Sequence, residues 1–180
     1  SQLVLPFTHL RNWGLFNETK YARVISQEKF GLIDTVGVKF VPCLFEDVGE
    51  ISENLIAIKR HGKWGFCDEN TKLRIPYNYN SVTGFNNGVS VVSVEGKYGL
   101  IDTKGSKLIA MEYDEMEWFN QNHLLVKKEN KYGIISIAGD EVLAISYVKI
   151  EATKDGKLLR LHKEGSFEYI FVSQVFRSNE

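Results

Sequence analysis

Short runs of apolar residues alternate with polar turns along most of the chain. The run Val91–Val94, for example, ends at Glu95-Gly96, and the next run begins at Lys97-Tyr98. Two such residues between β-branched or aromatic runs are typical of a tight β-hairpin turn. Nowhere do apolar residues keep a helical spacing over 11 or more positions, as an amphipathic helix requires. The pattern therefore predicts antiparallel β-strands and no long helix.

The same six-residue pattern occurs four times along the chain. It reads Lys-aromatic-Gly-apolar-apolar-Asp, and its glycines are Gly31, Gly65, Gly99 and Gly133, each 34 residues after the previous one. Further columns keep this spacing: Pro42, Pro76, Ala110 and Ala144; Phe45, Tyr79, Tyr113 and Tyr147; Val24, Ile58, Val92 and Val126; Val48, Val82, Met116 and Ile150. A fixed period of this length predicts tandem structural units.

Each unit is expected to be a three-stranded antiparallel meander. A period of 34 also suits paired helices, but the turn Asp102-Thr103-Lys104-Gly105 followed by the short run Leu108-Ile109 favours strands. We expect the Asp carboxylate to accept backbone N–H bonds within this turn. We expect the recurrent Gly to leave room for an aromatic ring that lies across a neighbouring strand.

The repeats predict one all-β domain over residues 1–180. Its units lie near 29–62, 63–96, 97–130 and 131–164, with atypical capping segments at 1–28 and 165–180. Tandem units of this kind stack into a solenoid-like or superhelical array. The alternative is a closed, propeller-like toroid of about five units, since the chain is slightly longer than five periods.

The two ends depart from the repeat. Trp13-Gly14 lies half a period out of register and is either a shortened first unit or a coincidence. Near the other end, Glu168 stands in the Gly column of a degenerate fifth unit. Alternation along that strand predicts that Phe167, Tyr169 and Phe171 share one face.

The repeat resembles the WG repeat family, also called KWG repeats. The best match is Lys63-Trp64-Gly65-Phe66-Cys67-Asp68 with Arg74-Ile75-Pro76 and Tyr79, and the resemblance covers about residues 16–150. It implies an all-β repeat domain, found mainly in bacterial proteins, with no general catalytic activity. Two features depart from the family: Trp occurs once in register, and Ser136 replaces the Asp of the fourth unit.

The composition and net charge of the chain argue against several classes of protein. The 22 Lys and Arg against 23 Asp and Glu leave a formal charge of -1, which argues against a nucleic-acid partner. A content of 43% hydrophobic residues argues against a disordered chain. No run approaches the roughly 18 apolar residues of a membrane-spanning helix. No signal peptide is visible after Ser1, which leaves the compartment open, with the bacterial envelope or secretion preferred over the cytoplasm.

No residues predict catalysis, a cofactor or a metal site. Cys43 and Cys67 stand in columns that otherwise take large apolar side chains, so we expect them to be structural. None of the four histidines has a metal-ligand spacing, and no nucleophile or phosphate-binding motif occurs. The recurrence of Lys and Asp in several units indicates a structural role, because a catalytic site needs one constellation.

The residues that break the repeat predict a binding surface. Trp118 is expected to lie in an acidic connecting segment, Glu112–Phe119, at the position where other units have Gly84 and Glu50. Exposed Trp and Tyr often anchor partners, and aromatics beside Asn or carboxylates suit a sugar. The competing interpretation folds Trp118 onto the core. The candidate binding residues are Trp118, Tyr113, Asp114, Tyr77, Tyr79 and Asn80.

These residues predict a non-catalytic interaction or scaffold domain that binds another protein. The alternative is a carbohydrate- or cell-envelope-binding domain of a bacterial surface or secreted protein. The chain is expected to be a monomer or part of a larger chain.

Overall fold

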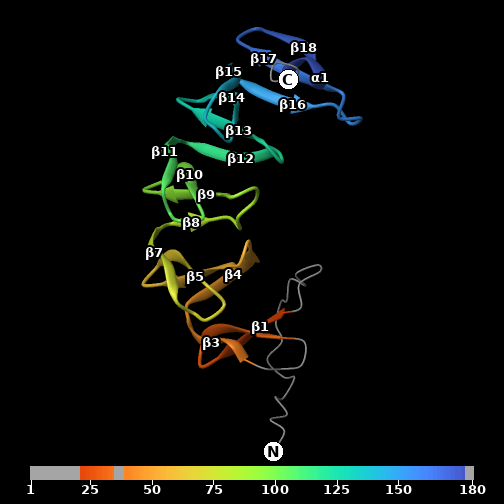
Figure 1. Ribbon diagram of the computed structural model, residues 1–180. Helices are drawn as coiled ribbons and strands as arrows, with labels where there is room; N and C mark the ends of the chain where they lie inside the picture. The colour runs from red at the N-terminus through yellow and green to blue at the C-terminus, as the bar shows by residue number, and fades with distance from the viewer. Residues whose placement is uncertain (1–20, 35–38, 177–180) are drawn as a thin grey trace, which may run out of the picture. The chain divides into compact units, whose positions relative to one another are not determined.

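The chain is organised as a series of antiparallel β-sheets. The structure is a computed structural model that describes residues 21–34 and 39–176, whose strands form five sheets (Figure 1). Trp13-Gly14 lies outside these residues. The chain divides into two compact units, residues 1–79 and 80–180. In the described part, the one helix is α1 (Val172–Val175). The predicted all-β fold of tandem repeats is confirmed.

The first unit contains two sheets, in which strands follow one another in chain order. The first sheet has the order β1-β2-β3 and the second the order β4-β5-β6-β7. Their bounds are β1 (Tyr21–Ser26), β2 (Lys29–Asp34), β3 (Lys39–Phe45), β4 (Asp47–Ser52), β5 (Leu55–Arg60), β6 (Lys63–Cys67) and β7 (Leu73–Tyr79).

The second unit contains three sheets of the same kind. Their orders are β8-β9-β10-β11, β12-β13-β14-β15 and β16-β17-β18. The bounds are β8 (Ser81–Val82), β9 (Val89–Val94), β10 (Lys97–Asp102), β11 (Lys107–Tyr113), β12 (Glu115–Asn120), β13 (His123–Lys128), β14 (Lys131–Ser136), β15 (Glu141–Tyr147), β16 (Lys149–Ala152), β17 (Leu158–Lys163) and β18 (Ser166–Phe171). Each described sheet is open, and none closes into a barrel.

Three of the sheets have four strands, where the sequence predicts three. The additional strand is β4, β8 or β12, and it precedes the predicted meander. It forms because the column of Val48 and Met116 is apolar and pairs with the next strand, Val48 with Ile58 and Met116 with Val126. The prediction that Trp118 lies in a connecting segment is therefore wrong, since Trp118 is part of β12.

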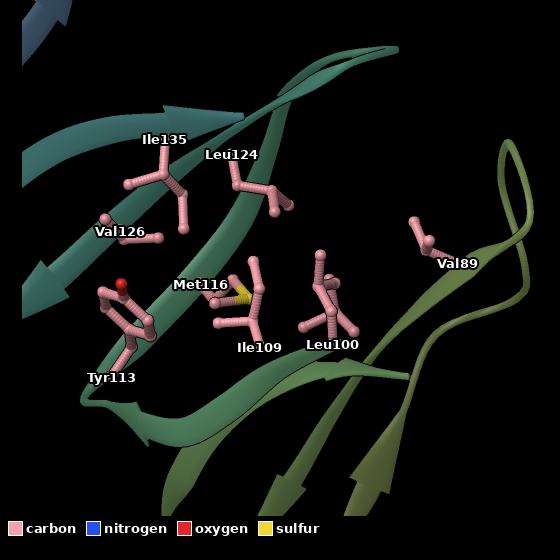
Figure 2. Packing of buried hydrophobic residues seen from close by; sticks show 9 residues of the cluster. Val89, Leu100, Ile109, Tyr113, Met116, Leu124, Val126 and Ile135 are labelled. Atoms are coloured by element: carbon pink, nitrogen blue, oxygen red, sulfur yellow. The ribbon is translucent and has the colours of Figure 1, made fainter. Parts of the chain in front are cut away.

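Apolar side chains fill the space between successive sheets of a unit. In the first unit, Leu32 and Val41 from one sheet pack with Ile56 and Ile58 from the next. In the second unit, Leu100, Ile109 and Tyr113 meet Met116, Leu124 and Val126 (Figure 2). A further core joins β12–β15 to β16–β18 and α1, and it contains Ile134, Leu143, Tyr147, Leu159, Leu161 and Val175. Burial of this apolar surface is the main stabilising contribution to each unit.

The recurrent glycines are required by the backbone of the following strand. A Cβ at Gly99 would lie 2.5 Å from the carbonyl oxygen of Ile109, and one at Gly65 would lie 2.6 Å from that of Ile75. The register shift between β10 and β11 brings this backbone close. The sequence predicted that an aromatic ring lies over each Gly. That contact does not explain why Gly is needed at positions 65 and 99, because the atoms nearest to an added Cβ belong to the backbone.

The turns after β6 and β10 are closed by the Asp of the repeat, as predicted. The carboxylate of Asp102 accepts bonds from the N–H groups of Lys104 (2.9 Å) and Ser106 (2.7 Å). In the fourth unit, the hydroxyl of Ser136 accepts bonds from the N–H groups of Ala138 (3.2 Å) and Asp140 (3.1 Å). Ser136 therefore replaces Asp in the sequence while making the same type of contact.

Candidate binding surface

Asp114 lies at the corner where β11 leads into β12. Its carboxylate contacts Lys97 Nζ at 2.5 Å and accepts a 2.9 Å bond from the N–H of Glu129. Glu129 belongs to the β13–β14 hairpin turn and has a positive φ of 51°, a conformation that non-Gly residues adopt at a cost. Asp114 thus fixes a hairpin turn of the next sheet to the corner.

Asn80 makes the equivalent contact one repeat earlier. Its side-chain oxygen accepts a 3.0 Å bond from the N–H of Glu95, which lies in the β9–β10 turn. In the first unit, Glu46 binds the N–H groups of His61 (2.9 Å) and Gly62 (2.8 Å) in the same way. Glu46, Asn80 and Asp114 are spaced by 34 residues. Two of the predicted binding residues therefore belong to a recurring corner contact.

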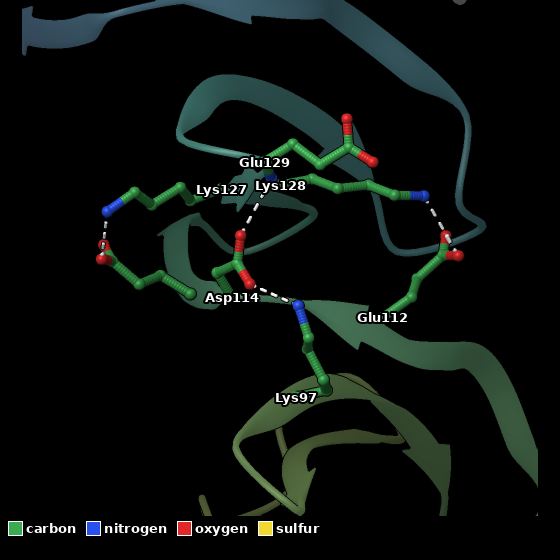
Figure 3. A network of polar contacts seen from close by, with 7 residues as sticks. Lys97, Glu112, Asp114, Lys127, Lys128 and Glu129 are labelled. Atoms are coloured by element: carbon green, nitrogen blue, oxygen red, sulfur yellow. Dashed lines mark hydrogen bonds and ion pairs between the residues drawn. The ribbon is translucent and has the colours of Figure 1, made fainter.

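The acidic segment around Asp114 is matched by lysines from neighbouring strands. Lys127 Nζ lies 2.8 Å from Glu115 and Lys128 Nζ lies 3.1 Å from Glu112, beside the Lys97–Asp114 pair (Figure 3). The hydrogen bond from Lys97 is the main cause of the lowered pKa of Asp114. Exposed pairs of this type contribute little stability singly. Together they leave this surface with alternating charges instead of an acidic patch.

Cross-strand pairing explains why the acidic and basic stretches meet. Glu115 on β12 is directly opposite Lys127 on β13. These ion pairs were not predicted from the sequence. The signal that would have found them is the hairpin turn between β12 and β13, which places residues 115 and 127 opposite each other.

The candidate tyrosines are largely buried. Tyr79 on β7 is 8% exposed and Tyr113 on β11 is 7% exposed, and burial raises the pKa of both hydroxyl groups. Tyr77 is half-buried against the core of the first unit. Trp118 is half-buried and packs against the core between β8–β11 and β12–β15. Trp118 thus lies against the core, as the competing interpretation of the sequence proposed.

The six predicted residues fall into two groups. Tyr77 and Tyr79 belong to the first unit, at β7. Asn80 begins the second unit, in which Tyr113, Asp114 and Trp118 lie at the end of β11, the following corner and β12. Their role in binding stays a prediction.

Among the described residues, the largest group of exposed aromatic side chains lies on β18. Phe167, Tyr169 and Phe171 are 52%, 54% and 54% exposed, and alternation places them on one face of the strand. The rings of Phe167 and Tyr169 meet edge to face with centroids 5.7 Å apart. The Arg160 guanidinium lies 4.0 Å above the Phe167 ring. We call this surface, formed by Phe167, Tyr169, Phe171 and Arg160, the aromatic face.

The sequence predicted that the three aromatic residues share a face, but not that the face is exposed. Two signals in the sequence were available. Glu168 stands in the Gly column, so β18 lacks the position that lets the next strand approach closely. The chain after Phe171 continues into α1, and no strand pairs with the outer edge of β18 in the described part of the chain.

The side chains of Cys67 and His123 take part in packing. Cys67 is fully buried, and burial raises the pKa of its thiol to about 12, so the thiolate form is disfavoured at neutral pH. His123 is half-buried, binds Asn120 Oδ1 at 2.9 Å and packs on Phe176. Among residues 21–34 and 39–176, no three His, Cys, Asp or Glu side chains form a potential metal site.

The described residues contain no helix with the length and apolar character needed to span a membrane.

Comparisons with known proteins bear on the repeat and on the fold. A family model described as WG containing repeat matches residues 30–64, 64–98 and 98–132. No curated protein gives a significant match.

Solved structures of Hsv2 from Kluyveromyces lactis are similar in fold. One matches with a TM-score of 0.54 at 11% identity, over 94% of this chain and 65% of that one. A variant whose loop 6CD is replaced by a Gly-Ser linker gives 0.54 at 14% identity, over 89% and 62%. The chain thus spans less than two thirds of the length of these β-propeller-like proteins. At this identity the likeness concerns the fold alone.

Proposed function

Because the chain belongs to the family of WG containing repeats, whose model covers more than half of it, we propose that it is a non-catalytic repeat domain that binds another protein and acts as a scaffold. Repeat domains of this kind present extended surfaces built from successive units. The aromatic face is the observation that carries the proposal.

The aromatic face has the composition of a protein-binding site. Three large rings are each about half exposed on one strand. Aromatic residues and Arg are enriched at the energetic centres of protein interfaces. The other exposed large apolar side chains of the described strands, such as Leu44, Leu73 and Leu108, are each the single residue of this kind on their strand. A partner that covers the aromatic face would therefore remove the largest exposed aromatic group from water.

The absence of catalysis is part of the proposal. The polar residues that recur between units close turns and corners, as Asp102 and Asp114 do. Such roles explain their presence without a reaction. The buried Cys67 thiol, with its raised pKa, is unsuited to act as a nucleophile.

A glycan is the second candidate partner, and the same face favours it. Exposed rings beside Arg160, His162 and Glu151 offer stacking surfaces together with hydrogen-bonding groups. The Nε2 atom of His162 lies 2.8 Å from Glu151. The buried rings of Tyr79 and Tyr113 offer less surface for stacking than the sequence suggested.

Binding assays with matched variants test the proposal. The Tyr169→Lys variant changes the aromatic face, and Leu108→Lys is the control because Leu108 is 48% exposed on β11. We expect wild type and the control to recover the same proteins from a lysate of the native organism, and Tyr169→Lys to lose at least one of them. A glycan array probed with the same three proteins distinguishes the second candidate. Equal recovery by all three proteins and no glycan binding would contradict both candidates.

A further inference from the structure

We propose that the aromatic face is covered by a second copy of this chain, which places its first sheet against the last sheet of its neighbour in a head-to-tail contact. This inference rests on the proposed function, because it names the partner of the same face. It follows from a comparison of the two terminal sheets with the equivalent positions of the inner sheets.

Residues equivalent to the aromatic face are covered in the inner sheets. Strand pairing aligns Tyr169 on β18 with Ile134 on β14, since Tyr169 is opposite Arg160 and Ile134 is opposite Leu125. Ile134 is fully buried because it packs against Leu159 and Leu161 of the next sheet. Tyr169 occupies the same position but is 54% exposed. The aromatic face is therefore the surface on which a further sheet would pack.

The first sheet exposes the complementary surface. In the second sheet, Ile56 and Cys67 are buried against the sheet that precedes it. The equivalent residues of the first sheet, 34 positions earlier, are Ala22 and Ile33, which are paired on β1 and β2. Ala22 is exposed and Ile33 is half-buried. This surface, which we call the front face, would pack on a preceding sheet.

The last sheet also lacks a strand that the inner sheets possess. The strands β7, β11 and β15 each follow the Gly-containing strand and pair with it, whereas β18 is the edge of its sheet among residues 21–34 and 39–176. An unpaired edge exposes backbone N–H and C=O groups that a further strand can bind. The last sheet of one copy therefore has both an open edge and an exposed face.

The chain carries a segment with the sequence pattern of the missing strand. Residues 3–9 read Leu-Val-Leu-Pro-Phe-Thr-His, and β7 reads Leu-Arg-Ile-Pro-Tyr-Asn-Tyr. Leu5, Pro6 and Phe7 thus correspond to Ile75, Pro76 and Tyr77. In the inner sheets, such a strand directly precedes the next sheet, as β11 precedes β12. Residues 3–9 precede the first sheet in the same order.

A second copy of the chain would cover the aromatic face with its front face and so continue the order of the repeat. The strands β16–β18 of one copy, followed by the first sheet of the next, reproduce the succession of sheets found inside each unit. The contact joins two different surfaces, so it is heterologous, and the pair as a whole retains one free aromatic face and one free front face. A mutual pairing of two β18 edges would instead use the same surface twice.

Sedimentation velocity of the full purified chain tests the contact over a range of concentrations. Ala22→Lys blocks the front face and Tyr169→Lys blocks the aromatic face, and both side chains are exposed, so neither variant should unfold. We expect wild type to show a mass that rises with concentration, and each variant alone to remain monomeric. An equimolar mixture of the variants should form a heterodimer and nothing larger, because one intact surface of each kind remains. Leu108→Lys should behave as wild type.

Two results would overturn the contact. One is a wild-type chain that remains monomeric at all concentrations. The other is association that the Ala22→Lys variant retains, which would indicate pairing through β18 alone. Neither result bears on the lysate assay, in which loss of a different protein on Tyr169→Lys would still support the proposed function.

Discussion

At the residue scale, the glycine at the start of each repeat is fixed by a backbone contact. The stretch Ala110–Glu112 lies opposite Gly99, and the carbonyl oxygens of Ile109 and Ala110 would be 2.5 and 2.8 Å from an added Cβ. A Gly99→Ala substitution forces the two strands apart, because backbone atoms cannot rotate away as a side chain can. We expect a loss of about 1–3 kcal/mol in the free energy of unfolding.

Urea denaturation followed by tryptophan fluorescence measures this loss. Gly96→Asn is the matched control, since Gly96 has a φ of 79°, which Asn tolerates, and no atom within 4 Å of an added Cβ. If both variants shift the midpoint equally, the close approach of the β11 backbone does not explain why Gly recurs every 34 residues in this chain.

Substitutions of the corner residue Asp114 test whether its contact with the β13–β14 turn stabilises the second unit. Asp114→Asn retains an oxygen that can accept the N–H bond of Glu129, as Asn80 does with Glu95, whereas Asp114→Ala removes it. We therefore expect Asp114→Ala to lower the thermal midpoint of the second unit at pH 7 more than Asp114→Asn does. Equal midpoints for the three proteins would contradict the corner contact.

The same carboxylate predicts a pH dependence. The hydrogen bond from Lys97 keeps the pKa of Asp114 in the folded chain below its value in the unfolded chain, which is about 3.9. The unfolded state thus binds more protons, so the stabilisation is present above this pH and is lost as pH falls through the folded pKa. The difference in thermal midpoint between wild type and Asp114→Asn should shrink between pH 7 and pH 3. A constant difference would contradict this cause.

The roles and exposure of individual side chains were predicted less well from the sequence than the strands and the repeat were. The turn role of Asp102 was predicted because Asp and Gly three residues apart are typical of a tight turn, and its hydrogen bonds confirm it. The exposure of Tyr79 and Trp118 was not accessible, because an aromatic ring in a strand can face either a core or solvent. Only the neighbouring sheet decides which, and the sequence does not place that sheet.

At the element scale, the strand β12 shows what periodicity detects and what it omits. The columns predicted the hairpins and the period correctly, because turns with Gly are local signals. The additional strand was missed because its sequence, Glu-Met-Glu-Trp-Phe-Asn, differs from that of β4, Asp-Val-Gly-Glu-Ile-Ser. Two apolar positions are shared, Met116 with Val48 and Phe119 with Ile51, and the first of them is buried in the core. Pairing with a neighbouring strand therefore specifies this element more than its own residues do.

The side chain of Met116 supplies the corresponding prediction. It is 5% exposed and packs with the core between β8–β11 and β12–β15, whereas Glu117 on the same strand is exposed. We expect Met116→Ala to lower the free energy of unfolding by about 2–5 kcal/mol, and Glu117→Ala to have a small effect. Urea denaturation of both variants measures the difference. Similar small effects would mean that β12 contributes no packing to the sheet.

At the scale of the whole molecule, apolar packing between successive sheets of the 34-residue repeat stabilises each unit. Each core draws side chains from two successive sheets of a unit, as Leu100 does with Leu124 and Ile134 with Leu159. A sheet with no neighbour leaves one face uncovered, which is the position of the aromatic face. The repeat thus explains most of the composition, and the terminal sheets retain the surface available for a partner.

The second unit should fold without the first, because two of its cores lie within residues 80–180. We expect a chain of these residues to show a β-sheet circular dichroism spectrum and a cooperative urea transition by Trp118 fluorescence, Trp118 being its one Trp. Leu124→Ala in this fragment should lower the free energy of unfolding by about 2–5 kcal/mol, because Leu124 is fully buried. Leu108→Ala is the exposed control. A fragment without a transition would mean that the packing between its three sheets is too weak to stabilise the unit alone.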